Sequence, residues 1–143
     1  MPNLILKYCK LSSIEKKMFF EAFIISFYAR LLILFLSFKS LEKKLGSKSS
    51  LFPKYDHQNK ELLVLIKRSI LRSAKYSIWR NKCFEQSLTA AIMLKRRKYH
   101  YVLHFGLTKK DNKLKAHVWI ESNGYYLVNK GNVEFSTLLT YFG

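Results

Sequence analysis

The fold of this chain is decided by residues 82–129, which read KCFEQSLTAAIMLKRRKYHYVLHFGLTKKDNKLKAHVWIESNGYYLVN. In the first third of this stretch the apolar residues recur at helical spacing, which predicts a helix from about Lys82 to Lys98 with Asn81 as its N-cap. We expect the basic residues 95–98 to be a solvated helix end that complements the helix dipole. From Tyr99 onward apolar residues alternate, as they do in strands. A helix followed by closely spaced strands predicts an α+β fold with an antiparallel sheet.

The alternation predicts three strands, at Tyr99–Leu107, Leu114–Glu121 and Tyr125–Asn129, with a charged turn over Thr108–Lys113 between the first two. The last residues, 135–142, fit a short helix or a strand equally well.

Ser122-Asn123-Gly124 is a strong hairpin signal between the last two of these strands. A three-residue loop with Gly124 in the left-handed conformation would make Glu121 face Tyr125, and would place His117 opposite Asn129. A two-residue loop at Asn123-Gly124 would instead put His117 and Asn129 on opposite faces.

The residues before this stretch are predicted to be helical. One helix is expected over residues 13–44, capped by Ser12 or Ser13, and another from about Lys60 to Ser77. Residues 46–59 are rich in helix-breaking residues and predict a connector within one domain. We therefore expect a single domain over residues 1–143, with a helical part (1–80) and an α+β core (81–143).

Met18–Phe38 is an apolar run of 21 residues, which is long enough to cross a bilayer. Glu21 and Arg30 interrupt it, and Arg30 would lie near mid-membrane at a cost of ~2.5–3.5 kcal/mol. The run is too long for a secretory signal, and no small-residue cleavage site follows it. We expect a core helix, with a membrane-embedded or membrane-surface helix as the less favoured alternative.

The chain is strongly basic, with 26 Lys and Arg against 9 Asp and Glu and a formal net charge of +17. Such a balance favours acidic partners, namely nucleic acid, an anionic membrane or an acidic peptide, although it also fits a compositional bias. No nucleic-acid-binding motif is recognisable, so we do not expect nucleic acid as a partner. The two cysteines, Cys9 and Cys83, indicate no disulfide framework, and no cysteine or histidine spacing indicates a metal site.

Cys83 stands at the start of a predicted helix, where unpaired N–H groups and the positive end of the helix dipole stabilise a thiolate. A nucleophilic cysteine needs a base, and the candidates are the four histidines, His57, His100, His104 and His117. His117 lies on the predicted hairpin, where Asn129 could orient its ring as the third member of a triad. A buried structural cysteine is the alternative interpretation of Cys83.

Two sequence blocks resemble a known family. The first runs from Trp79 through Cys83 and Gln86 to Leu94, and the second, AHVWIE, covers residues 116–121 and is followed by Gly124. Together they resemble the leader peptidase of lasso-peptide maturation, the stand-alone protease half of the split B protein, which has a transglutaminase-like (papain-like) fold with its nucleophilic cysteine at a helix N-terminus. The apolar opening helix with its basic end is also similar to that family.

The resemblance implies a cytoplasmic cysteine peptidase without metal or cofactor, in which Cys83 attacks the carbonyl between leader and core of a precursor peptide. His117 would be its base and Asn129 the third member, where the family usually has Asp. It also implies two protein partners, a small leader-recognition protein and an ATP-dependent macrolactam synthetase. The second-rank candidates for substrate or triad contacts are Gln86, Trp79, Trp119 and Glu121.

Two other functions fit the same residues. One is a basic binding module without enzymatic activity, which would bind an acidic peptide, nucleic acid or a membrane surface. The other is an inactive relative of the peptidase, because Asn129 stands in place of Asp. Both remain open at this point.

Overall fold

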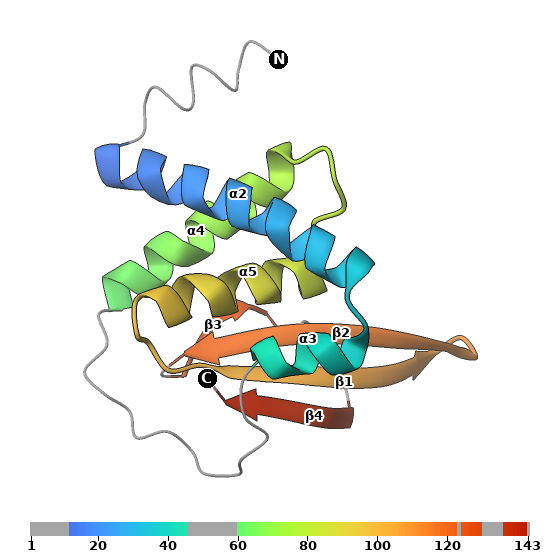
Figure 1. Ribbon diagram of the computed structural model, residues 1–143. Coiled ribbons are helices and arrows are strands. Elements are labelled where there is room, and N and C mark those ends of the chain that lie inside the picture. The colour runs from blue at the N-terminus through green and yellow to red at the C-terminus, as the bar shows by residue number, and fades with distance from the viewer. Residues whose placement is uncertain (1–11, 46–59, 123, 130–135, 143) are drawn as a thin grey trace.

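A computed structural model describes residues 12–45, 60–122, 124–129 and 136–142. The predicted connector 46–59, His57 and Cys9 lie outside these residues. The described residues form four helices and a four-stranded antiparallel sheet. Figure 1 shows α2, α4 and α5 above the sheet, so the predicted α+β class with N-terminal helices packed on a C-terminal sheet is confirmed. The elements are α2 (Ser13–Phe35), α3 (Phe38–Leu45), α4 (Lys60–Tyr76), α5 (Cys83–Arg96), β1 (Val102–Lys110), β2 (Lys113–Ser122), β3 (Tyr125–Val128) and β4 (Ser136–Phe142).

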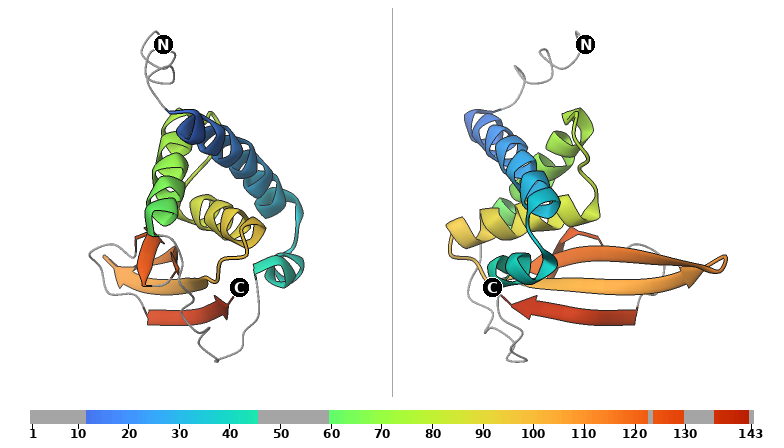
Figure 2. Two further views of the ribbon diagram at one scale, coloured as in Figure 1. Left: turned by 90° about the vertical axis from the view of Figure 1, so that its left-hand side faces the viewer. Right: turned by 45° about the vertical axis from the view of Figure 1, so that its right-hand side comes forward.

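The sheet has the order β3-β2-β1-β4, and each neighbouring pair is antiparallel. Residues 136–142, which fitted helix or strand in the sequence, form strand β4 beside β1. Figure 2 shows that the hairpin of β1 and β2 extends well past the helices.

The turn between β1 and β2 is shorter than predicted. Pairing continues as far as Lys110 and Lys113, so the charged turn expected over Thr108–Lys113 is wrong. Only Asp111 and Asn112 form the turn, with φ values of 52° and 62°. Asp and Asn tolerate this left-handed conformation better than other non-glycine residues, and a two-residue turn with two positive φ angles matches the twist of a hairpin.

The turn between β2 and β3 is also shorter. Ser122 pairs with Tyr125, and Glu121 pairs with Tyr126, so the predicted three-residue loop is wrong, although Gly124 has the expected positive φ of 79°. The register then shifts, because Ile120 pairs with Val128. This bulge leaves one extra residue on β3 and bends it. The pairing ends there, so Asn129 is not the cross-strand partner of His117.

The predicted helix over residues 13–44 is broken into two. Ser12 caps α2 as expected, and its side chain and that of Glu15 form a reciprocal capping box. Leu36 is extended, with φ −99° and ψ 144°. The hydroxyl of Ser37 then accepts a hydrogen bond from the backbone N–H of Ser40 (3.3 Å), which is how a serine caps a new helix.

Helix α5 begins one residue later than predicted, and Asn81 is not its N-cap. Lys82 holds that position, and its backbone N–H donates to Oε2 of Glu85 (3.2 Å). The amide of Asn81 is 7% exposed, and neither of its polar side-chain atoms has a hydrogen-bond partner among the described residues. The helix ends before Lys98, whose positive φ of 58° stops it.

The core lies where α5 packs on β2 and β3 and where α2 and α4 cover α5. Its largest fully buried side chains come from α4, α5, the sheet and the residue before β1, and they are Leu63, Ile66, Ile70, Leu88, Met93, Leu94, Tyr101, Leu103, Ile120 and Leu127. Burial of this apolar surface is the main favourable term in folding.

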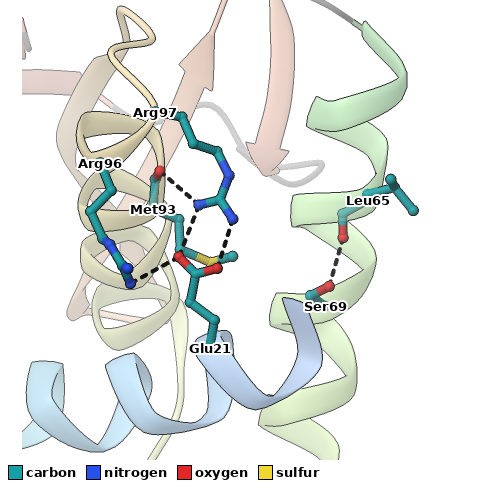
Figure 3. A network of polar contacts seen from close by, with 6 residues as sticks. All are labelled: Glu21, Leu65, Ser69, Met93, Arg96 and Arg97. Carbon is teal, nitrogen blue, oxygen red and sulfur yellow. Dashed lines mark hydrogen bonds and ion pairs between the residues drawn. The ribbon is translucent and has the colours of Figure 1, made fainter. Parts of the chain in front are cut away.

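The two charged residues inside the apolar run of α2, Glu21 and Arg30, each form an ion pair with a residue far along the chain. The carboxylate of Glu21 accepts hydrogen bonds from Arg97 Nη2 (2.6 Å), Arg97 Nη1 (2.9 Å) and Arg96 Nη1 (3.1 Å), as Figure 3 shows. The bond to Glu21 is the main reason why the pKa of Arg97 is raised. The sequence predicted that the basic end of α5 is a solvated helix end. This is only partly right, because Arg96 and Arg97 bind Glu21 of α2.

Tyr101 gives the fold a testable dependence on alkaline pH. Its side chain is 1% exposed, and burial raises its pKa to about 12, against an ordinary value near 10. The neutral phenol is favoured in the folded chain, so its contribution is fully present below pH ~10 and is lost as the pH rises toward 12, by at most roughly 3 kcal/mol. We expect Tyr101→Phe to lose less stability between pH 9 and about 11.5 than the natural chain, as measured by urea unfolding.

An equal loss of stability in the two proteins would contradict this expectation. A titration at 295 nm provides the direct check, because the Tyr101→Phe protein should lack the highest-pH phenolate transition.

Candidate functional site

Cys83 is the first residue of α5, as the sequence predicted. It forms no disulfide and is half-buried at the edge of the core. The first N–H groups of a helix have no partner within the helix, and together with the dipole they favour negative charge at this end. A thiolate and a developing oxyanion would both be stabilised here.

The start of α5 is fixed by Glu85, a residue that the sequence analysis missed. Its side chain is 2% exposed, and Oε1 accepts a hydrogen bond from Nη1 of Arg30 in α2 at 3.1 Å. Nε of Arg80 lies 3.6 Å from the same oxygen. The signal that could have revealed Glu85 is its place three residues after the N-cap, where a capping-box carboxylate stands.

Gln86 and Trp79 support the same segment. Nε2 of Gln86 donates to the backbone carbonyl of Asn81 (3.0 Å), so its side chain reaches back to the residues that precede α5. Nε1 of Trp79 donates to the hydroxyl of Ser26 (3.3 Å), and its ring lies 4.7 Å from that of Phe23. In this structure both side chains hold the approach to Cys83 in place, and Trp79 packs on α2 as a core aromatic would.

His117 lies on β2, and its ring is held by the backbone of Asn129. Its Nε2 is 2.8 Å from the carbonyl oxygen of Asn129. A carbonyl can only accept a hydrogen bond, so Nε2 carries the proton in this contact and the lone pair of the neutral ring is on Nδ1. This is the tautomer in which Nδ1 can act as a base.

The side chain of Asn129 does not make that contact. Its Oδ1 accepts a hydrogen bond from Nζ of Lys67 in α4 at 3.1 Å. The sequence analysis expected the Asn129 amide to orient His117. The structure brings the two residues together as predicted, but through the main chain, because the bulge in β3 changes the register.

Trp119 and Glu121 share the sheet face of His117. The ring of Trp119 is 3% exposed and is stacked between His117 (5.9 Å between centroids) and His104 (5.3 Å). Oε1 of Glu121 lies 3.7 Å from Nε2 of His104, and the charge of Glu121 raises the pKa of Tyr126. These contacts make Glu121 part of a sheet-surface network.

Cys83 and His117 lie on elements that pack together. The hydroxyl of Ser87, one helical turn after Cys83, donates to the carbonyl of Val118 at 3.2 Å. However, Phe84 packs on Phe105 (5.4 Å), which pairs with Val118. Side chains alternate between the two faces along β2, so His117 lies on the sheet face opposite the one that α5 covers. Within the described residues, no hydrogen bond joins the sulfur to the imidazole, and no group of three metal-ligating side chains is found.

The comparisons with known proteins add one match. The family model described as the transglutaminase-like superfamily matches residues 27–140, a range that contains Cys83, His117 and Asn129. No curated protein and no solved structure matches the chain. The matched range covers most of the chain, with α5 and strands β1 to β3 in full and most of β4. The chain therefore belongs to the transglutaminase-like superfamily.

Proposed function

We propose that the chain is a cysteine peptidase that removes the leader from a lasso-peptide precursor. The observation that carries the proposal is the position of Cys83, which opens a buried helix within a domain of a superfamily whose members are typically cysteine peptidases. The motif resemblance in residues 79–94 and 116–124 supports the leader peptidase within that class.

In this proposal the thiolate of Cys83 attacks the carbonyl at the end of the leader, and the backbone N–H groups at the start of α5 bind the oxyanion. Nδ1 of His117 first takes the thiol proton and then gives it to the leaving amine of the core. The thioester that remains on Cys83 is hydrolysed by water, which releases the leader and restores the thiol.

The reaction needs the sulfur of Cys83 and Nδ1 of His117 to come within ~3–4 Å, a contact that the described residues do not make. Because His117 lies on the sheet face opposite the one that α5 covers, we propose that β2 and the start of α5 rearrange to form this contact when the precursor binds. The Nε2 contact with Asn129 supports this role, because it sets the tautomer that the base needs.

The resemblance also supports the partners. A small leader-recognition protein would present the precursor, and an ATP-dependent macrolactam synthetase would close the ring after the cut, all in the cytoplasm. The net charge of +17 supports an acidic peptide as substrate or partner.

The direct test is mass spectrometry of the precursor after incubation with the chain and the leader-recognition protein. Hydrolysis gives two fragments whose masses sum to the precursor plus one water, whereas acyl transfer gives a leader fragment that carries an added amine. We expect the first result. An intact precursor after prolonged incubation with both proteins would contradict the proposal.

The missing contact between the sulfur and the imidazole favours one alternative, an inactive relative. A peptide aldehyde with the leader's C-terminal sequence separates the two, because it forms a reversible adduct only with a nucleophilic thiol at the site. We expect saturable binding that the Cys83→Ala protein lacks, and equal binding by both proteins would support the inactive relative.

A further inference from the structure

Helix α2 is apolar on all sides, but the other described residues bury only one of them. The covered side carries small and apolar residues that are at most 7% exposed, namely Met18, Ala22, Ile25, Ser26 and Ala29. They pack against α4 and α5. A helix that is apolar all round is normally buried all round.

The opposite side forms what we call the outer stripe. Its members are large apolar side chains at spacings of four, three, seven and one residues, which places them along one face of the helix: Phe20 (58% exposed), Ile24 (51%), Phe27 (46%), Leu34 (55%) and Phe35 (80%). The left view of Figure 2 shows α4, α5 and the sheet all on one side of α2. A contiguous exposed stripe of this kind marks an interaction surface.

The stripe cannot belong to a membrane-spanning helix in this fold, although α2 is long and apolar enough by composition. Glu21 is bound to Arg96 and Arg97, and Arg30 is bound to Glu85, so both charges inside the apolar run of α2 tie it to α5 and its C-cap. Insertion would break both pairs and expose the covered side. The helix can therefore contact a membrane only along its length, with the stripe facing the lipid.

The charges around the stripe favour an anionic lipid surface over an apolar protein partner. Exposed Lys17 lies near its start, and exposed Lys39 and Lys43 follow its end. The described acidic residues of α2, Glu15 and Glu21, are engaged in the capping box and the ion pairs. Cations beside an apolar face are typical of helices that lie in the headgroup region.

A pocket beside the stripe also combines apolar side chains with cations. Its volume is 430 Å³, and it lies between α2, α3 and α5. Apolar side chains line it together with three cations, which are Lys43, Lys95 and Arg96. This combination matches an anionic lipid, whose headgroup would contact the cations while its chain contacts Leu32, Leu88 and Ile92.

We propose that the chain docks on an anionic membrane surface through the outer stripe of α2, which lies flat in the headgroup region. The inference is independent of the peptidase activity, because it rests on α2 and its surroundings and not on Cys83 or His117.

The test is co-sedimentation with vesicles of phosphatidylcholine and phosphatidylglycerol in a 3:1 ratio, with pure phosphatidylcholine vesicles as the uncharged comparison. The variant Phe20→Gln/Ile24→Gln/Phe35→Gln removes three stripe residues that are exposed and therefore not needed for folding. The matched control Leu71→Gln/Ile78→Gln/Leu114→Gln removes three apolar residues that are 51%, 98% and 73% exposed elsewhere. Thermal melting checks that all proteins are folded.

We expect the natural chain to bind the anionic vesicles, the stripe variant to bind at least about tenfold more weakly, and the control to stay within about threefold. Lys43→Gln/Lys95→Gln should also weaken binding, by about fivefold per lysine at low salt. Equal binding by the stripe variant and the control would overturn the proposal. The proposal would also be overturned if the natural chain did not bind vesicles but formed dimers or larger oligomers in ultracentrifugation that the stripe variant does not form.

Discussion

Cys83→Ala and His117→Ala proteins are each expected to lose leader cleavage by at least about 10³-fold, whereas Asn129→Ala should lose less than about fivefold. The first two remove the proposed nucleophile and base. The third leaves the main chain unchanged, and it is the carbonyl of Asn129, not its amide, that holds Nε2 of His117. The measurement is the rate of precursor cleavage at a saturating concentration of the leader-recognition protein.

Lys67→Met is the matched control for Asn129→Ala. The Asn129 amide accepts a hydrogen bond from Lys67, so either substitution removes the same bond between α4 and the end of β3. The two proteins should therefore have similar rates and similar, slightly lowered stability. If Asn129→Ala instead falls as far as His117→Ala while Lys67→Met does not, the amide is a true third member of the triad.

The helices and strands that carry the site were predictable because their apolar periodicity is strong. The change from helical spacing to alternation near Tyr99 located the end of α5 and the start of the sheet to within a few residues. The position of Cys83 at a helix start followed from where the helical spacing begins, near Lys82. Turn lengths were not predictable, because Thr108–Lys110 fits a charged turn as well as the end of a strand until the pairing partner is known.

The link between His117 and Asn129 shows a different limit. The sequence favoured their proximity through a three-residue loop, and the structure reaches it through a two-residue loop and a bulge. A bulge has no reliable sequence signal when no glycine marks it. A contact through a backbone carbonyl has none at all, because every residue has a carbonyl. Residue identities alone therefore assigned the contact to the amide.

The charges in α2 show a third limit. The sequence identified Glu21 and Arg30 as interruptions of an apolar run, and that argument disfavoured a spanning helix. It could not name their partners, which lie 55 to 76 residues away in α5. Nor could it show that the remaining apolar residues of α2 divide into a covered side and an outer stripe, since both sides are apolar in the sequence.

Glu85→Ala is expected to produce the largest loss of stability of any single substitution at the site, about 2–4 kcal/mol. Its carboxylate is 2% exposed, and removal leaves the guanidinium of Arg30, itself 23% exposed, without its partner. It also removes the acceptor for the Lys82 N–H at the start of α5. Urea unfolding measures the change in the free energy of unfolding.

A double-mutant cycle shows whether the pair or the cap is responsible. Arg30→Met leaves the hydrogen bond between Glu85 and the Lys82 N–H in place, whereas Glu85→Leu removes it. Arg30→Met/Glu85→Leu removes both charges of the pair and replaces them with apolar side chains of substantial volume. If the buried charge pair dominates, the double variant should be more stable than Glu85→Leu alone, because the guanidinium of Arg30 is no longer left without its partner. If it is no more stable, the loss belongs to the helix start, and Glu85 then acts on Cys83 through the geometry of the first turn of α5. In that case Glu85→Ala should also lower the peptide-aldehyde affinity of the folded fraction, whereas Arg30→Met should not.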